Sequence, residues 1–369
     1  DPDAGSVLMA ANRKLPAWVD LGLLPLLNLA MAFLVSGLVI VVIGEDPLQA
    51  VRLLLYGALG YGEAVGYTLY YATNFIFTGL AVAVAFHAGL FNIGGEGQAY
   101  LGGLGAALVG LWLGHLPWPV SLPLAVLAAA LFGAVWGFVP GWLQARRGNY
   151  VAASLMTYLL VNVLIKPGQS APESAVFPDP VWLPQIWEVM AALGVDIGRS
   201  PLNLAFVLAL VGCVLVWLLV WKTRVGYELR VVGKSEPAAV YAGISPARIT
   251  ILAMTLSGAL AGLMATNEIL GYQHRLLLNF TGGAGFVGIA VALMGRNHPI
   301  GIVLAAVLFG ALYQGGSELA FDMPKISRDL VVVVQGLVIL FAGALEHMFR
   351  PRLEGMFARP ASMAEAAAT

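Results

Sequence analysis

Three polar side chains interrupt a glycine-rich stretch of the chain, FHAGLFNIGGEGQAYLGG, which covers residues 86–103. Asn92, Glu96 and Gln98 bring two amides and a carboxylate into an otherwise apolar pattern. Such groups are costly in apolar surroundings. They indicate either a path where unwound backbone and amides meet a polar solute, or a tight turn whose side chains satisfy exposed backbone groups. The pattern supports both interpretations equally.

The rest of the sequence contains no convincing group of catalytic residues. His87 and Glu96 are nine residues apart, and His115 and His298 fall in expected turns. Neither HExxH nor CxxC occurs, although these spacings are the common signatures of metal sites. We therefore predict no catalytic residue and no metal-binding residue.

Two short motifs imitate nucleotide-binding sites. GAGFVG at residues 283–288 matches the pattern GxGxxG, but no strand precedes it and no acidic residue follows at the required distance, so close helix packing explains its glycines better. Gly233, Lys234 and Ser235 resemble the end of a phosphate-binding loop, but Glu228 stands where the first glycine of that loop is required. If a nucleotide drives this protein, another chain must hydrolyse it.

The composition indicates a protein of the lipid bilayer. Of the 369 residues, 60% are hydrophobic, only 11% are charged and 44 are glycines, which leaves too few polar residues to cover the surface of a water-soluble fold. The net charge of -1 gives no case for a nucleic-acid partner. A single cysteine, Cys213, excludes a disulfide within the chain.

Apolar stretches long enough to cross a membrane, about 20 residues each, recur along the whole chain. We predict an all-α, polytopic membrane protein with ten transmembrane helices. The third and eighth are rich in glycine, so either could be a broken or re-entrant helix packed inside the protein. The ten predicted spans lie near 21–43, 65–86, 97–114, 120–144, 150–165, 201–221, 249–267, 280–295, 299–316 and 329–345.

Lysine and arginine are distributed unevenly between the two sides of these spans. With the amino terminus inside, 13 of the 19 basic residues lie on the cytoplasmic side, as the positive-inside rule requires. We therefore place both termini in the cytoplasm, with an N-terminal segment 1–20, a transmembrane domain 21–348 and a tail 349–369. The first twenty residues lack an apolar core and a cleavage site, so we expect no secretory signal before the first span.

The cytoplasmic loop 222–248 contains signals for a short capped helix. Ser235 can cap it, Pro237 is tolerated in its first turn, and Gly243 suits a left-handed stop. A compact helix in a basic loop beside the membrane is typical of a docking surface, and an ordinary solvated loop is the alternative. The longest external loop, 166–200, fits an amphipathic lid in which QIWEVMAAL lies in the membrane interface, or a surface for a soluble partner.

Four longer segments resemble the permease subunits of bacterial ABC importers in the ribose and branched-chain amino-acid group. They are GLAVAVAFHAGLFNIGGEGQ at 79–98, YAGISPARI at 241–249, GFVGIAVALMGRNHPIGIVLAAVLFGAL at 285–312 and MPKISRDLVVVVQGLVILFAGA at 323–344. GLFNIGGEGQ and ALMGRNHPIG are most similar to nucleoside and simple-sugar permeases of that group.

The resemblance implies a permease of the bacterial cytoplasmic membrane that works by alternating access. It implies a second permease subunit, identical or different, a cytoplasmic ATPase that binds ATP and magnesium, and an extracytoplasmic substrate-binding protein. No cofactor is then expected in this chain. The coupling helix that contacts the ATPase would be formed by Glu236, Pro237, Ala238, Ala239, Tyr241, Ala242, Gly243 and Ile244.

The resemblance also implies a nucleoside or similar small polar solute, with a simple sugar as the alternative. Rings such as Tyr67 and Tyr70 offer stacking faces, and amides offer hydrogen bonds. Asn162, Asn267 and Glu268 are weaker candidates, because a lone polar group in a span more often bonds a neighbouring helix. We predict that the substrate path includes Asn74, Phe75, Phe91, Asn92, Glu96 and Gln98.

The chain departs from the nucleoside permeases at two places. Tyr150, in NYVAASLMTYLL, stands where those permeases usually carry an acidic residue, and a proline common in the second span is replaced around Asn74 and Phe75. Both changes concern the identity of the solute, or they mark one member of a heterodimer. Two rival hypotheses are an ion-coupled carrier or channel working alone, with Glu96 as its titratable group, and a scaffold subunit that lines no path.

Overall fold

A computed structural model gives the fold of the protein, and every regular element among its described residues is a helix. Strand-like pairing in this part of the chain is limited to two isolated bridges, which join Glu173 to Leu277 and Gln185 to Asn203. This confirms the predicted all-helical class. The described residues are 16, 19–147, 163, 173–323, 325–326, 330–337, 340, 353 and 355–357.

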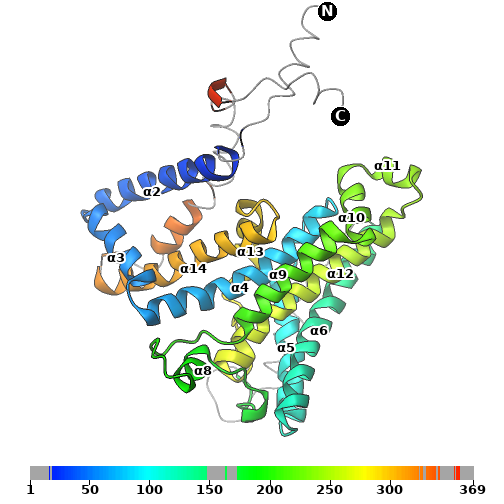
Figure 1. Ribbon diagram of the computed structural model, residues 1–369, viewed down its shortest axis with the longest axis horizontal. Coiled ribbons are helices and arrows are strands. Elements are labelled where there is room, and N and C mark those ends of the chain that lie inside the picture. The colour runs from blue at the N-terminus through cyan, green and yellow to red at the C-terminus, as the bar shows by residue number, and fades with distance from the viewer. Residues whose placement is uncertain are drawn as a thin grey trace, which may run out of the picture. The chain divides into compact units, whose positions relative to one another are not determined.

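The helices of the described residues follow one another in the order shown in Figure 1. They are η1 (Val19–Leu23), α2 (Leu24–Val42), α3 (Pro47–Leu59), α4 (Gly62–His87), α5 (Gly95–Leu113), α6 (Trp118–Arg147), η3 (Asp179–Val181), α8 (Ile186–Ala192), α9 (Ala205–Lys222), α10 (Arg224–Lys234), α11 (Glu236–Tyr241), α12 (Pro246–Ala265), η4 (Thr266–Gln273), α13 (Ala284–Met294) and α14 (Pro299–Asp322).

The helices agree with most of the predicted spans, and the described residues do not confirm the count of ten. Five of them are long and apolar enough to cross a membrane, and α2 with α3 makes a sixth if that pair, bent by 120°, is one broken span. Helix α3 lies between the first two predicted spans, where no helix was predicted. The predicted span near 150–165 and most of the one near 329–345 lie outside the described residues.

The described residues fall into two compact units, one covering 53–318 and the other made of the residues on either side of that range. In the larger unit, α4 is the central helix, and every residue from Ala72 to Ala85 is buried. Helices α9, α12 and α13 pack against α4, and α5 and α6 lie on the far side of α12 (Figure 1).

Glycines allow α6 and α12 to approach each other backbone to backbone. Gly133 and Gly137 lie four residues apart on α6, and they face Gly258 and Gly262 on α12. A Cβ atom added at Gly137 would collide with the carbonyl oxygen of Met254. Small residues at this spacing are typical of tightly packed membrane helices, because close approach increases the van der Waals contact.

Helix α13 starts near the middle of the bundle and reaches only one of its ends. Its 11 residues span about 16 Å, roughly half of the hydrocarbon thickness. Gly288 packs against Thr78, nine residues before the end of α4, whereas the carbonyl of Asn297, just after α13, lies 3.1 Å from Nε2 of His87 at that end. The glycine-rich eighth segment is therefore a half-length helix.

Candidate functional site

Glu96 joins the amino-terminal ends of two helices inside the larger unit. Glu96 is in the first turn of α5, and its carboxylate accepts hydrogen bonds from the amides of Gly283, at 3.1 Å, and Gly285, at 2.7 Å, which begin α13. The hydroxyl of Thr281 donates to the same carboxylate. A carboxylate stabilises exposed amides at a helix start, so Glu96 serves here as a shared cap for α5 and α13.

Asn92 and Gln98 form a closed network with Ser257 of α12. The Asn92 amide donates to Gln98 and to Ser257, both at 2.7 Å, and Gln98 donates back to Asn92 at 3.2 Å. The Ser257 hydroxyl in turn donates a hydrogen bond to the carbonyl of Ala81 on α4, at 2.6 Å. All three side chains are buried. This is the geometry of the structural turn, one of the two interpretations that the sequence left open.

A second buried network lies between α4 and η4, which continues α12 as a π-helix. Asn74 donates to Glu268 at 2.6 Å, and Asn267 donates to Asn74 at 2.8 Å and to the carbonyl of Tyr70 at 3.0 Å. Asn203, just before α9, donates to Asn267 at 2.9 Å. Helix bulges of the π type occur frequently at functional sites. The network therefore joins the middle of α4 to η4 and to the residue just before α9.

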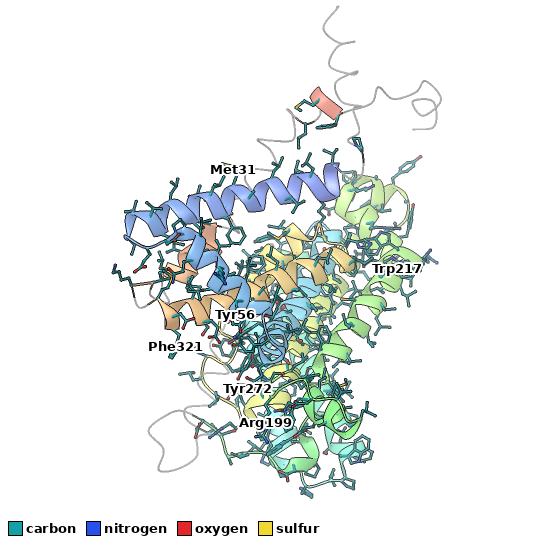
Figure 2. The ribbon with its side chains drawn as sticks, turned by 60° about the vertical axis from the view of Figure 1, so that its left-hand side comes forward. Met31, Tyr56, Arg199, Trp217, Tyr272 and Phe321 are labelled. Carbon is teal, nitrogen blue, oxygen red and sulfur yellow. The ribbon has the colours of Figure 1, made fainter. Side chains whose placement is uncertain are left out.

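Aromatic rings continue from this network toward α14. Tyr70 meets Tyr272 edge to face with ring centroids 5.4 Å apart, and Tyr71 lies 5.7 Å from Tyr313. Phe75 is buried and meets Tyr313 at 5.0 Å. Tyr272 keeps 41% of its surface exposed, and it is labelled in Figure 2. Tyr71 and Tyr313 are also partly exposed, whereas Tyr70 is buried. We call these four tyrosines the tyrosine face.

The predicted path residues therefore separate into several environments. Asn74 belongs to the buried network beside the tyrosine face, and Phe75 lies in the core behind it. Phe91 is 40% exposed and packs on Phe86, near the end of α4. Their part in a substrate path stays a prediction. Tyr272 and Tyr313 were not predicted as site residues, although each is a tyrosine inside a long apolar segment, and that was a visible signal.

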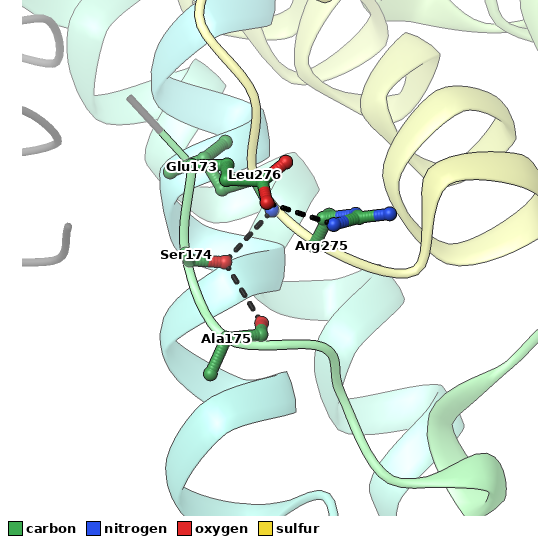
Figure 3. Close-up of polar contacts among 5 residues, drawn as sticks. All are labelled: Glu173, Ser174, Ala175, Arg275 and Leu276. Carbon is green, nitrogen blue, oxygen red and sulfur yellow. Dashed lines mark hydrogen bonds and ion pairs between the residues drawn. The ribbon is translucent and has the colours of Figure 1, made fainter. Parts of the chain in front are cut away.

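A short segment before η3 is hydrogen-bonded to the loop that leads into α13 (Figure 3). The Ser174 amide donates to the carbonyl of Leu276 at 3.0 Å, the Leu276 amide donates to the Ser174 hydroxyl at 2.9 Å, and Arg275 pairs with Glu173 at 2.9 Å. We call residues 173–177 with 274–277 the strap. Within it, His274 stacks on Trp182 with ring centroids 3.8 Å apart. Burial lowers the pKa of His274, and the charge of Asp179 partly offsets that effect.

The loop between α9 and α12 contains two helices where one was predicted. α10 packs Leu229 against Ala88 and Ile249, and Gly233 lies so close to the turn at Gly89 that any side chain there would collide with backbone. This packing accounts for the glycine of the false phosphate-binding motif. In α11, Ser235 accepts a hydrogen bond from the amide of Ala238.

Helix α11 has the predicted start and stop. Pro237 lies in its first turn, the helix ends at Tyr241, and Gly243 adopts the left-handed conformation with φ 76°. Tyr241 is 97% exposed and Val240 is 60% exposed, so an apolar tip projects from the unit. The docking function of α11 stays a prediction.

Long apolar helices packed around buried polar networks define a multi-pass membrane protein. The chain belongs to the family described as branched-chain amino acid transport system / permease component, whose model matches residues 64–343. It is thus an ABC transporter permease, a transport subunit whose ATPase is a separate subunit, and not an enzyme. The family in general works with a partner ATPase and a substrate-binding protein.

Three relatives illustrate this membership. A glucose ABC transporter permease of Haloferax volcanii is 35% identical, covering 97% of this chain and 96% of its own length. A guanosine ABC transporter permease of Bacillus subtilis is 36% identical over 87% of this chain and 93% of its own. A nucleoside ABC transporter permease of Lactococcus lactis is 31% identical over 86% and 90% of the two chains. No solved structure matches the chain.

Proposed function

We propose that the chain forms the translocation path of an importer for a nucleoside or simple sugar, and that the tyrosine face contacts the solute. The observation that carries the proposal is the tyrosine face itself, in which partly exposed phenol rings adjoin buried amides of Asn74 and Asn267. Rings stack on a nucleobase or on the apolar face of a sugar, while hydroxyl groups bond the polar edge. The names of the three relatives support the same two solute classes.

The coupling helix of the proposal is the segment Glu236–Ile244, with Tyr241 and Val240 as its exposed tip. An aromatic residue and a branched residue that protrude together fit a pocket on a partner, where large side chains provide most of the binding energy. Because Ser235 and Gly243 fix both ends, α11 can transmit a push as a rigid body. ATP and magnesium would bind to the partner ATPase, and this chain would bind no cofactor.

We infer the remaining partners and the location from the family. A second permease subunit completes the path, an extracytoplasmic binding protein delivers the solute, and the assembly lies in the cytoplasmic membrane of a bacterium with both termini inside. Lipid surrounds the apolar faces, and no nucleic acid takes part.

The experiment is uptake into proteoliposomes that contain the chain with its ATPase, its second permease subunit and its binding protein. We expect ATP-dependent uptake of radiolabelled guanosine or glucose, and competition by unlabelled compounds of the same class only. Replacing Tyr272 with Ala should lower uptake more than ATP hydrolysis, because the ring contacts the solute and not the ATPase. Uptake that proceeds unchanged without ATP would rule out the proposal.

A further inference from the structure

An apolar groove lies between α9 and the start of α14, away from the tyrosine face. Its cavity volume is about 240 Å³, and Val214 and Ile300 on its rim are 57% and 68% exposed. Figure 2 shows Trp217 at the edge of the unit that contains it. The groove therefore opens outward. It is lined by Cys213, Val214, Trp217, Pro299, Ile300 and Val303.

One end of the groove carries a cation and a hydrogen-bond donor. The ammonium of Lys222 lies 5.3 Å from the ring centroid of Trp217, and no carboxylate of the described residues pairs with it. His298 directly precedes Pro299, and its Nδ1 accepts a hydrogen bond from the Ile300 amide at 3.3 Å. A neutral histidine whose Nδ1 accepts must carry its proton on Nε2, so the ring also has a donor to offer.

We propose that this groove binds an anionic phospholipid from the leaflet on the side of α10. One acyl chain lies against Cys213, Trp217 and Val303, and the phosphate lies at Lys222 and His298. Tryptophan and lysine at the end of a membrane helix are the residues that meet the headgroup region, and a lysine there attracts anionic lipid. The proposal concerns a different surface from the solute path and does not depend on the identity of the solute.

Charge favours a lipid over a helix of the same chain. Helix α2 and the segment 148–172 contain no aspartate and no glutamate, so neither would neutralise Lys222. A phosphate would.

The test uses the full chain in vesicles that contain a photoreactive acyl chain on either phosphatidylglycerol or phosphatidylcholine. After illumination and digestion, mass spectrometry locates the modified peptides. We expect phosphatidylglycerol to modify residues of α9 and of the start of α14 at least severalfold more than phosphatidylcholine does. Equal modification by the two lipids, or modification spread evenly over the exposed helices, would overturn the proposal.

Two pairs of variants make the result specific. Val303→Trp fills the groove and should abolish the local modification, whereas Leu304→Trp, at an exposed neighbour that does not line the groove, should not. Lys222→Gln should lower the preference for phosphatidylglycerol about fivefold, the effect of one basic group near the surface. Lys234→Gln, on the exposed end of α10, is its control. Lys222→Gln keeps the groove intact, so it tests the proposal even if Val303→Trp fails to fold.

A protein occupant would give a different result. Because Cys213 is the only cysteine, it can be paired with a cysteine introduced at Leu34 or Leu38 on the exposed face of α2. Rapid disulfide formation in membranes, together with loss of lipid modification in the groove, would show that α2 covers it and would refute lipid binding.

Discussion

At the scale of single residues, Glu96 illustrates how a polar group in an apolar setting can be structural. Its carboxylate accepts from two backbone amides and from Thr281, and it thereby satisfies donors at the starts of α5 and α13. An ion-coupled carrier would need this carboxylate to exchange its proton during transport. The observed bonds instead give the carboxylate a structural role as a helix cap.

Replacing Glu96 should separate these roles. Glu96→Ala leaves the amides of Gly283 and Gly285 unpaired and should destabilise the protein by about 1–3 kcal/mol. Glu96→Gln keeps one acceptor and should cost less. Thermal unfolding in detergent measures both, and ATP-driven uptake should persist in Glu96→Gln. If that variant folded normally but lost all transport, the proton-coupled hypothesis would return.

Gly243 is the residue on which the end of α11, the proposed coupling helix, depends. It adopts a left-handed conformation, and no atom lies within 4 Å of the position that a Cβ would take. A side chain at this position would therefore meet no steric clash with other residues, and only the left-handed backbone conformation would be unfavourable for it. Gly243→Val should destabilise the end of α11 by about 1–2 kcal/mol and shift the tip of the helix. We expect ATP hydrolysis without uptake and normal membrane insertion. Normal coupling would show that α11 does not transmit the push.

At the scale of helices, the contact between α6 and α12 depends on the absence of side chains. Gly137→Ala places a methyl group against the carbonyl of Met254, and we expect destabilisation of about 1–3 kcal/mol, the usual cost of overpacking. Gly212→Ala on α9 is the control, because its nearest neighbour, Leu80, lies at an ordinary 3.6 Å. Melting temperatures that respond equally to both substitutions would contradict the packing argument.

The strap should loosen in acid. Because the pKa of His274 is lowered in the folded state, the unfolded state binds protons first as the pH falls below about 6.5. The stabilisation of the folded strap by neutral His274 is therefore complete above that pH, and it is lost as the pH falls through the lower pKa that His274 has in the folded state. Amide exchange at Ser174 and Phe177 should become faster over this range, after correction for intrinsic rates. His274→Gln should remove the pH dependence, while exchange within α4 stays constant.

Sequence patterns predicted local structure better than contacts between distant segments. Ser235, Pro237 and Gly243 determine α11 through their own backbone preferences, and the structure has the helix they predict. Asn92 bonds Ser257, 165 residues away, and no local pattern could name that partner. Helix α3 was missed because its mean hydropathy is moderate and a charged residue, Arg52, lies inside it. The tyrosine face required the same tertiary information, since its rings come from α4, η4 and α14.

At the scale of the whole molecule, alternating access predicts that the tyrosine face changes its exposure during the ATPase cycle while the buried networks do not. In a Cys213→Ala background, a cysteine replacing Tyr272 should react with a water-soluble thiol reagent at a rate that depends on the nucleotide bound by the partner ATPase. Saturating solute should slow this reaction, because it occupies the same surface. A cysteine at Asn92, which is only 1% exposed, should stay unreactive in every state.

These two positions also distinguish the rival interpretations of the sequence. A path along the glycine-rich turn would reverse the result, so that position 92 reacts in a nucleotide-dependent way and position 272 does not. A scaffold subunit would leave both rates independent of nucleotide. Only a path that runs along the tyrosine face combines a changing rate at 272 with protection by solute, because water must reach that surface before the solute can displace it.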